Sequence, residues 1–357
     1  MDGFLSLNQA AQFLGISRPT FNVRRTQFKL NEIQEGRSVW INKAELLTVY
    51  AKEHLVLGIS NLVVTETDTT QQLVIDKNTL DLRRINLIDA YGAISLLVET
   101  VEILEQEKRL YLVVANTGAI TLLCNMGFFT ELKRRFEGRV FWNSDSLPNI
   151  EKKIRHVLLP IKYIAYKGQE RKYLEEEIAP LIVKQGYDGD TTGYLQWMLG
   201  ELADNALTHA QGPCYVLAGQ FSKTNDCLEI AIGDAGKGIF NSLKENPRYS
   251  KLSDKIAFIK AFQSRVSSWP DDKPRGKGLN DALGMAMGSN SLLRVDSKGI
   301  GFLFNFSNGQ KELLEKTPAT SRGGAKFCWV LINSTFDKSD RSEVDQFISR
   351  EIEIRNG

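Results

Sequence analysis

An acid, an amide and an imidazole recur at intervals of four residues in the stretch GELADNALTHA, residues 200–210. These residues are Glu201, Asn205 and His209. Because a step of four residues returns to nearly the same side of an α-helix, the three side chains are expected to share one face. The opposite face is apolar and is expected to be buried; it comprises Leu195, Met198, Leu199, Leu202 and Ala206. Such a stripe is either a solvated helix face or part of a binding site.

Two glycine-rich turns follow this stripe along the chain. In CLEIAIGDAGKGI, an apolar strand delivers Asp234 into a turn that contains Gly236 and Gly238. A carboxylate there can accept a hydrogen bond from an exocyclic amine such as that of adenine. In PRGKGLNDALGMA, Gly276 and Gly278 lead into a helix, whose N-terminus can cradle phosphate. Each turn alone is a weak signal, and the order of the three motifs carries the interpretation.

The ordered motifs E-x-x-x-N-x-x-x-H, D-x-G-x-G and G-x-G-L resemble the GHKL ATPase domain. DNA gyrase, MutL, histidine kinases and the serine kinases of anti-anti-sigma factors share this domain. The resemblance covers residues 155–335 and implies ATP and Mg²⁺ as cofactors. It implies that Asn205 ligates Mg²⁺, a cation that prefers oxygen, and that Asp234 holds the adenine amine. Gly236 and Gly238 would shape the adenine pocket, and Glu201 would act as the general base.

A lid over the nucleotide is expected from residues 239–275, which are too long for an ordinary loop. The residues expected at the phosphates are Arg275, Gly276, Lys277, Gly278 and Leu279. Two positions depart from the family pattern. Ala325 in GGAKF stands where many relatives carry a threonine near the adenine, so a hydrogen bond or bridging water is expected to be missing there. Asn280 replaces a common glycine after G-x-G-L.

Residues 1–55 predict a small helical module. SLNQAAQFLGISRPTFNVRRTQF is typical of two short helices around a turn, with Ser6 and Ser17 as caps and Pro19 in the first turn of the second helix. RSVWINKAELLTVY is expected to form a strand and then a helix. This order of elements resembles the winged helix-turn-helix of the excisionase and MerR type.

DNA binding through residues 17–43 is therefore expected, with docking to another protein as the alternative. The positive residues of this region are Arg18, Arg24, Arg25, Lys29, Arg37 and Lys43. Side chains of the second helix would reach base edges, and the others would contact phosphates. The expected base contacts are Thr20, Asn22 and Arg24, and the expected phosphate contacts are Arg25, Lys29 and Arg37.

Strands and helices alternate between residues 56 and 150, which predicts an α/β layer. QQLVI, RLYLVVA and RVFW are expected to be strands, and LIDAYGAISLLVETVEILEQE and ITLLCNMGFFTELKRRF helices. The order is similar to a STAS domain, the fold of anti-anti-sigma factors. Phosphorylatable members carry a serine just after the aspartate of IDAYGA, where this chain has Ala90 followed by Tyr91. Because the segment lacks that hydroxyl, we expect it to dock a partner protein or to self-associate. The alternative is a generic α/β packing domain.

Composition limits the function further. The chain has 357 residues, a net charge of +2 and 42% hydrophobic residues, which indicates two or three packed domains rather than a general binder of nucleic acid. No apolar run reaches the roughly 18 residues that span a bilayer, and the first residues do not form a signal peptide. The cysteines form no C-x-x-C pair and are expected to be free thiols in a cytoplasmic protein. With three histidines, neither a histidine-rich metal site nor a histidine kinase is expected.

The combined prediction is a multidomain α/β protein. A winged helix-turn-helix (1–55), a STAS-like layer (56–150) and a GHKL α/β sandwich (155–335) precede a charged tail (336–357), which is expected to be solvated or to bind a partner. The expected function is a cytoplasmic regulator that binds Mg-ATP, hydrolyses it slowly and couples it to DNA or partner binding. A homodimer fits this function, and no membrane association is expected. The alternatives are a serine/threonine kinase acting on a separate partner, and an assembly ATPase whose helix-turn-helix docks protein.

Overall fold

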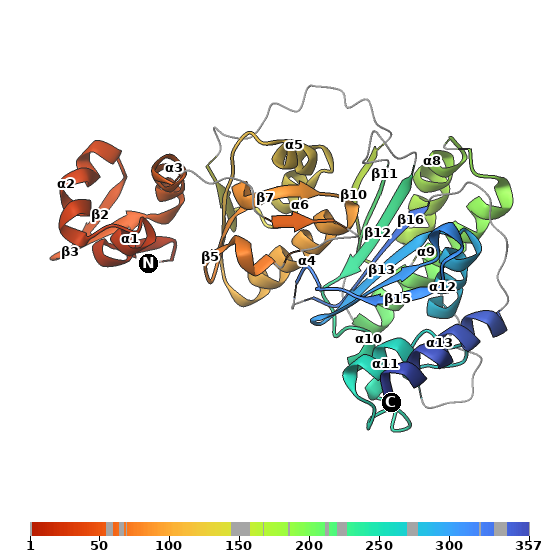
Figure 1. The fold of residues 1–357 in the computed structure, drawn as a ribbon. Helices are drawn as coiled ribbons and strands as arrows, with labels where there is room; N and C mark the ends of the chain where they lie inside the picture. Colours follow the sequence, from red (N-terminus) through yellow and green to blue (C-terminus); the bar gives the residue numbers. More distant parts are fainter. Residues whose placement is uncertain are drawn as a thin grey trace. The chain divides into compact units, whose positions relative to one another are not determined.

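The chain is mixed α/β with several sheets (Figure 1). Its internal contacts divide it into two compact units. The computed structural model describes residues 2–54, 60–63, 68, 70–143, 158–166, 168–184, 186–210, 214–219, 227–269, 278–320, 323–331 and 341–356. The first unit comprises residues 1–60, 71–87 and 103–153, and the second comprises 61–70, 88–102 and 154–357. Among the helices of these described stretches, none combines the length and apolarity needed to cross a membrane.

The first unit begins with a helical module built on a three-stranded antiparallel sheet of order β1-β3-β2. Its elements are β1 (Phe4–Ser6), α1 (Leu7–Phe13), α2 (Arg18–Phe28), β2 (Glu32–Glu35), β3 (Ser38–Asn42) and α3 (Lys43–Glu53). Ser6 and Gln9 form a reciprocal capping box at α1, and Ser17 caps α2. These helix starts agree with the sequence prediction. Phe21 and Ile41 are buried in the module's core.

The first unit also contains a four-stranded sheet of order β5-β6-β8-β9 and two helices. Its strands are β5 (Val74–Asp76), β6 (Thr79–Asp81), β8 (Leu110–Val113) and β9 (Val140–Trp142). The single helix predicted at 120–136 is two helices, α5 (Gly118–Asn125) and α6 (Phe128–Arg135), because Gly127 between them has a left-handed φ of 79°. The first residues of the predicted strand QQLVI form a 3₁₀ turn, Thr70–Leu73, instead. A separate two-stranded sheet is formed by β4 (Ser60–Leu62) and β7 (Ile85–Ile88).

Lys43 joins the helical module to the four-stranded sheet. Its Nζ donates to Asp76 Oδ2 at 2.8 Å and to Asn78 Oδ1 at 2.8 Å, and it lies over the ring of Tyr111. Burial lowers the pKa of the Lys43 ammonium, although the hydrogen bond to Asp76 opposes this shift. Lys43 therefore does not belong to the exposed positive surface predicted for residues 17–43.

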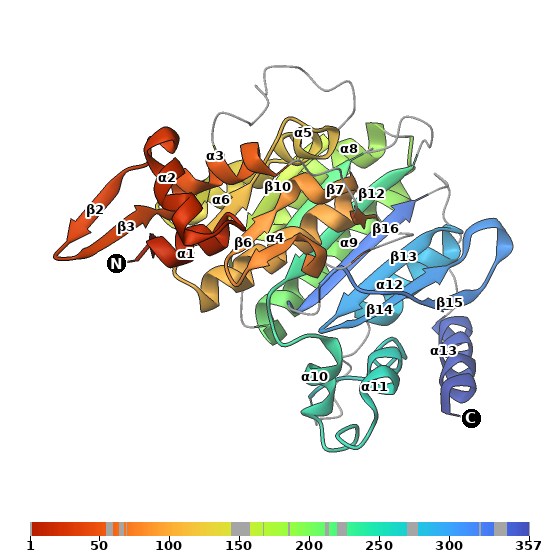
Figure 2. The ribbon, with the colours of Figure 1, turned by 60° about the vertical axis from the view of Figure 1, so that its left-hand side comes forward.

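The second unit is built on a seven-stranded antiparallel sheet of order β10-β11-β12-β16-β13-β14-β15 (Figure 2). The strands are β10 (Leu158–Ile164), β11 (Cys214–Gly219), β12 (Leu228–Asp234), β13 (Leu292–Ser297), β14 (Ile300–Asn305), β15 (Glu312–Glu315) and β16 (Ala325–Leu331). The helices are α4 (Ala90–Gln106, assigned to this unit up to Glu102), α7 (Gln169–Tyr173), α8 (Ala179–Lys184), α9 (Gly189–Asn205), α10 (Ile239–Lys244), α11 (Asp254–Lys260), α12 (Gly278–Gly288) and α13 (Arg341–Asn356). A π-helical turn, Leu174–Ile178, links α7 and α8.

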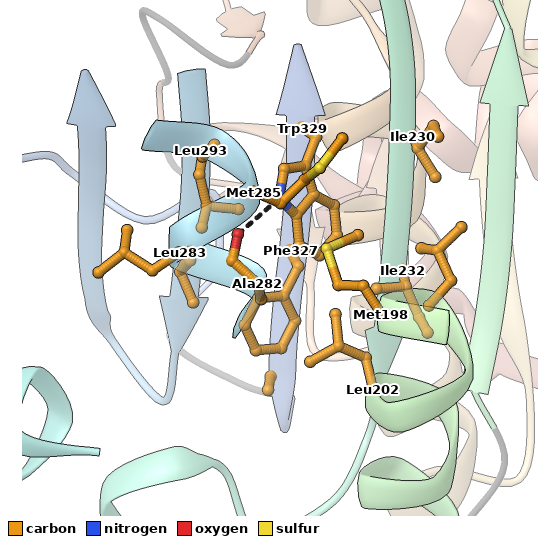
Figure 3. Packing of buried hydrophobic residues seen from close by; sticks show 14 of the residues in the cluster. Met198, Leu202, Ile230, Ile232, Ala282, Leu283, Met285, Leu293, Phe327 and Trp329 are labelled. Carbon is orange, nitrogen blue, oxygen red and sulfur yellow. Dashed lines mark hydrogen bonds between the residues drawn. The ribbon is translucent and has the colours of Figure 1, made fainter. Parts of the chain in front are cut away.

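One face of this sheet packs against α9 and α12. Successive strand residues point to opposite faces, so Ile230 and Ile232 of β12 and Phe327 and Trp329 of β16 lie on the same side. Figure 3 shows them packed against Met198 and Leu202 of α9 and Ala282 and Met285 of α12, and Trp329 Nε1 donates to the carbonyl of Ala282 at 3.4 Å. These residues form the main core, which supports the polar stripe of α9.

The other face of the same sheet carries charged residues and is covered by α4. Arg294 and Asp296 of β13 are fully buried and joined at 2.7 Å. The hydroxyl of Tyr91 donates to Asp296, and the Ala90 N–H donates to Glu229 of β12 at 3.2 Å. The Ala90–Tyr91 turn, which stands where phosphorylatable STAS members carry a serine, is therefore buried against the chain's own sheet.

The described parts of the segments predicted as a lid and as a charged tail are packed into the core. Residues 239–269 of the predicted lid form α10, α11 and the turn after them, and Phe262 of that turn contacts Phe304 with ring centroids 5.0 Å apart. In α13, Val344, Phe347 and Ile348 are buried in the same cluster. Residues 341–356 are therefore not a solvated segment, because this helix has an apolar face in addition to its charges.

Candidate functional site

A pocket of about 510 Å³ opens in the second unit between α9, α12 and the ends of β12 and β16. It is lined by Trp197, Glu201, Leu202, Asp204, Asn205, Ala206, Thr208, Asp234, Lys237, Gly238, Ile239, Ser242, Leu243, Ala261, Val266, Ser267, Ser268, Trp269, Gly278, Leu279, Ala325 and Phe327. The pocket thus brings together residues from all three predicted motifs. Its size is in the range of small-molecule and cofactor sites.

Helix α9 contributes the polar stripe. Asp188 caps the helix by accepting a hydrogen bond from Thr191 N at 2.7 Å. The predicted apolar face is confirmed, since each of its five residues is buried. Glu201 and Asn205 are partly exposed and line the pocket one turn apart. The helix continues after Asn205 as a π-helical turn, Ala206–Ala210, and the side chain of His209 in this turn lies outside the described residues.

Asp234, the last residue of β12, is 7% exposed and lies at the pocket floor. Its Oδ1 accepts a hydrogen bond from Gly236 N at 2.8 Å, and its Oδ2 accepts one from Ala325 N at 3.3 Å. Burial raises the pKa of this carboxyl to about 6, and these two N–H donors hold the pKa from rising further. The side chain is therefore mainly ionised at neutral pH, when it can accept a hydrogen bond from a ligand amine.

Two glycines allow close packing around Asp234, one against its carboxylate and one against Ser297. A Cβ atom at Gly324 would lie 1.7 Å from Asp234 Oδ1 and 2.5 Å from Gly236 N. Gly238 has a φ of 82°, and a Cβ there would lie 2.4 Å from Ser297 Oγ. Gly238 lines the pocket, and Gly236 contacts Asp234 through its backbone N–H. Gly324 was not among the predicted site residues, although it is part of the GGAKF motif.

The start of α12 closes the opposite end of the pocket. Gly278 is its first residue, and a Cβ there would lie 3.2 Å from Asn205 Nδ2 and 3.3 Å from Glu201 Cβ. Helix N-termini carry a partial positive charge and unpaired N–H groups, so they favour anions. Leu279 also lines the pocket. The predicted phosphate-facing residues Arg275, Gly276 and Lys277 lie outside the described residues.

Two tryptophans that the sequence analysis missed also line the pocket. Trp197 is 41% exposed and Trp269 is 44% exposed. Trp197 precedes Glu201 by four residues, so the same helical spacing that identified the stripe could have found it. The segment before Trp269 is held by Asn246, whose Nδ2 donates to the carbonyls of Ser267 at 3.0 Å and Trp269 at 3.2 Å. These half-exposed indole rings add to the apolar part of a pocket wall that also carries polar residues.

Ala325 lies where the sequence analysis expects a missing hydroxyl. It lines the pocket, is 8% exposed, and contacts Asp234 through its backbone N–H. A methyl group cannot donate or accept a hydrogen bond, so the Ala325 side chain offers a ligand only an apolar contact. Asp234, and not residue 325, therefore provides the hydrogen-bonding side chain beside this position.

The residues predicted to contact DNA lie on or beside α2 and the β2–β3 turn. Arg18, Thr20, Asn22, Lys29 and Arg37 are exposed, while Arg24 and Arg25 are partly buried.

Three of these side chains already have partners. Arg25 pairs with Glu32 of β2 at 3.0 Å, and the Arg24 guanidinium lies 5.6 Å from the centroid of the Phe28 ring. The Thr20 hydroxyl bonds to the capping Ser17. Val23 on the same helix is 73% exposed. The surface is thus mixed in charge, and Arg25 is paired to an acid.

Within the described ranges, no three His, Cys, Asp or Glu residues come together as a metal site. Glu201 and Asn205 nevertheless place a carboxylate and an amide, both with oxygen atoms, one turn apart on the pocket wall. Mg²⁺ commonly binds through one or two such protein oxygens together with phosphates and waters. The donor set therefore fits Mg²⁺ that arrives with a phosphorylated ligand.

Comparisons with known proteins give no match for this chain: no family model matches it, and neither a curated protein nor a solved structure does so significantly.

Proposed function

We propose that this chain binds Mg-ATP in the pocket between α9, β12 and α12. The observation that carries the proposal is the convergence of Glu201, Asn205, Asp234 and Gly278 on one pocket. These residues come from three motifs that are far apart in the sequence. Their order matches the GHKL ATPase pattern, and we propose that the second unit, apart from α4, is a domain of this type.

Each pocket residue has a distinct role in this proposal. The Asp234 carboxylate accepts a hydrogen bond from the adenine amine. The Asn205 side-chain oxygen ligates the cation, and the N-terminus of α12 at Gly278 faces the phosphates. When bound, Mg²⁺ neutralises phosphate charge. Glu201, one turn before Asn205, orients a water molecule for attack and accepts its proton.

Slow ATP hydrolysis follows from this arrangement, because phosphoryl transfer needs mainly positioning and charge neutralisation. The protein would then be a cytoplasmic regulator whose nucleotide state controls the binding of DNA or of a partner protein. The second candidate is a serine/threonine kinase that acts on a separate protein. It is favoured by the half-exposed Trp197 and Trp269, which give the pocket an apolar border that a protein substrate could contact.

We further propose that the N-terminal module is a winged helix-turn-helix that binds DNA through α2 and the β2–β3 turn. Its support is the capped helix pair, the antiparallel hairpin and the exposed side chains of Arg18, Lys29 and Arg37. Residues 56–150 remain proposed as STAS-like. Self-association as a homodimer is compatible with these assignments.

Incubation of the purified protein with γ-labelled ATP and Mg²⁺ tests these functions. Label released as phosphate supports hydrolysis, whereas label on a serine of an added protein supports the kinase. Calorimetry with Asp234→Asn and Asn205→Ala tests the site itself, since the first weakens adenine recognition and the second removes a metal ligand. If both variants bind ATP as tightly as the wild type, ATP does not bind in this pocket.

A further inference from the structure

Asp345 on α13 accepts hydrogen bonds from two segments that contribute to the pocket wall. Its Oδ1 accepts from the backbone N–H of Ser264 at 2.7 Å and from Asn280 Nδ2 at 3.1 Å. Its Oδ2 accepts from the Ser264 hydroxyl. Ser264 follows α11 in the chain, and Asn280 lies in the first turn of α12. A single carboxylate therefore joins α13 to the segments before and after residues 270–277.

The Ser264 contact fixes a strained turn. Arg265, the next residue, has a φ of 63°, in the left-handed region that non-glycine residues adopt at a cost of about 1 kcal/mol or more. The residues after it, 266–269, line the pocket. Such strain persists only where surrounding contacts determine the conformation. The two hydrogen bonds from Ser264 to Asp345 supply contacts of this kind.

The Asn280 contact fixes the start of α12. Asn280 is 1% exposed, and its Nδ2 also donates to the Phe262 carbonyl at 2.9 Å. Arg341, in the first turn of α13, binds the adjacent Asp281 through two hydrogen bonds of 2.9 and 3.1 Å. Gly278 is the residue of α12 that abuts Glu201 and Asn205. Helix α13 therefore binds the turn of α12 that lies against the polar stripe of α9.

We propose that Asp345 is a positioning residue for the nucleotide pocket, through which α13 controls how tightly the nucleotide is held. Its carboxylate fixes residues 266–269 on one pocket wall and Gly278 and Leu279 on another. None of the described residues that line the pocket belongs to α13. The role rests on the proposed binding of Mg-ATP and adds a segment that the motifs themselves do not include.

Asp345→Asn in the full chain tests this role, with Glu353→Gln as the matched control because Glu353 is exposed on the same helix. We measure the Kd of Mg-ATP by calorimetry and the dissociation rate of a fluorescent ATP analogue by displacement with unlabelled ATP. Asp345→Asn is expected to weaken binding by roughly 5- to 150-fold, the usual range of coupling between two sites, mainly through faster dissociation. Glu353→Gln is expected to bind as the wild type does. Unchanged affinity in a folded Asp345→Asn protein would overturn the proposal.

Ser264→Ala provides a second, milder variant that leaves the carboxylate in place. In a double-mutant cycle, Ser264→Ala should weaken binding in the wild-type background and have little further effect in Asp345→Asn. Strictly additive effects would contradict the proposed linkage.

Hydrogen exchange of the nucleotide-free protein separates this inference from the proposed function. Asp345→Asn should speed exchange at residues 264–269 and 278–283, whether or not ATP binds, while Glu353→Gln should not. If the wild type fails to bind Mg-ATP, the proposed function is wrong, and the exchange data still decide whether Asp345 holds the pocket walls. Unchanged exchange in these segments would refute the positioning role by itself.

Discussion

The backbone of Gly324 lies directly against the carboxylate of Asp234, and the Gly324 N–H donates to the Asp234 carbonyl at 2.9 Å. A methyl group at Gly324 would overlap Asp234 Oδ1, so Gly324→Ala should displace the carboxylate and reduce ATP affinity by at least tenfold. Calorimetry with Mg-ATP measures this loss.

Gly193→Ala is the control, since a Cβ at this exposed position on α9 has open space around it. That substitution should stabilise the helix by about 0.5–1 kcal/mol and leave binding unchanged. A Gly324→Ala protein with wild-type affinity would show that ATP binding does not depend on the present position of the Asp234 carboxylate.

ATP affinity should depend on pH through Asp234. Because its pKa is raised to about 6, lowering the pH through 6 protonates the carboxylate that accepts the adenine amine. Affinity should therefore fall, by up to about tenfold per pH unit below 6. Calorimetry between pH 5 and pH 8 measures the profile. Asn205→Ala keeps the Asp234 carboxylate. This variant should bind ATP more weakly than the wild type at every pH, and its affinity should fall below pH 6 by the same factor as that of the wild type. A flat wild-type profile would indicate that Asp234 does not contact the ligand.

The same carboxyl should oppose folding at neutral pH. Its pKa rises from an ordinary 3.8 to about 6 on folding, so its ionised form costs about 3 kcal/mol. Below pH 3.8 the carboxyl is protonated in both the folded and the unfolded state, so it costs no stability. As the pH rises through 6, the folded protein loses this advantage and bears the full cost of the ionised form. Asp234→Asn does not ionise, although its amide loses one acceptor for the N–H groups of Gly236 and Ala325. The free energy of unfolding of the wild type should therefore fall relative to that of the variant, by up to that amount, as the pH rises from below 4 to 7. Urea unfolding of both proteins at pH 4.5 and pH 7 measures this change, and a stability difference that is the same at both pH values would contradict this account.

Glu201→Ala separates catalysis from binding. As a general base, Glu201 should be needed for turnover, so hydrolysis should fall by roughly 10²–10⁴-fold with ATP affinity nearly unchanged. If Glu201 instead only orients Asn205, binding itself should weaken. Phosphate release and calorimetry on the same preparation distinguish the two roles. Hydrolysis at the wild-type rate would exclude Glu201 as the base.

The ion pair between Arg25 and Glu32 gives a directional test of DNA binding. Glu32→Gln removes the acid that neutralises Arg25, so DNA affinity should rise and its salt dependence should steepen by about one phosphate contact. Arg24→Ala combined with Arg25→Ala should lower affinity. Fluorescence anisotropy over a salt series measures both effects. If neither substitution changes the affinity, the module docks protein and does not bind DNA.

The sequence predicts the pocket better than it predicts what surrounds the pocket. The α9 stripe, the strand that ends at Asp234 and the helix after Gly278 are found as expected, because each depends on local spacing and short-range backbone preferences. Trp269 lines the pocket and Gly324 lies against Asp234 through contacts distant in sequence, which local patterns do not encode.

The burial of the charged residues in the seven-stranded sheet also depends on contacts distant in sequence. Alternation along β13 places Arg294 and Asp296 on the face opposite the apolar core. Both are nevertheless buried, because α4, from a distant part of the chain, covers them. The tail prediction fails for a related reason. Charged residues dominate the composition of α13, but its placement depends on Val344, Phe347 and Ile348.

The burial of α4 also affects how the chain reaches its native state. Tyr91 and its partner Asp296 are 205 residues apart in the sequence. At about 5–20 residues per second on the ribosome, α4 would emerge roughly ten to forty seconds before the strand that covers it. During that interval the buried side of α4, which includes Ile94, Leu97 and Val98, would be exposed to water. We therefore expect a fragment ending at residue 150 to aggregate or to require a chaperone, even though the sequence pattern alone would place a domain boundary there.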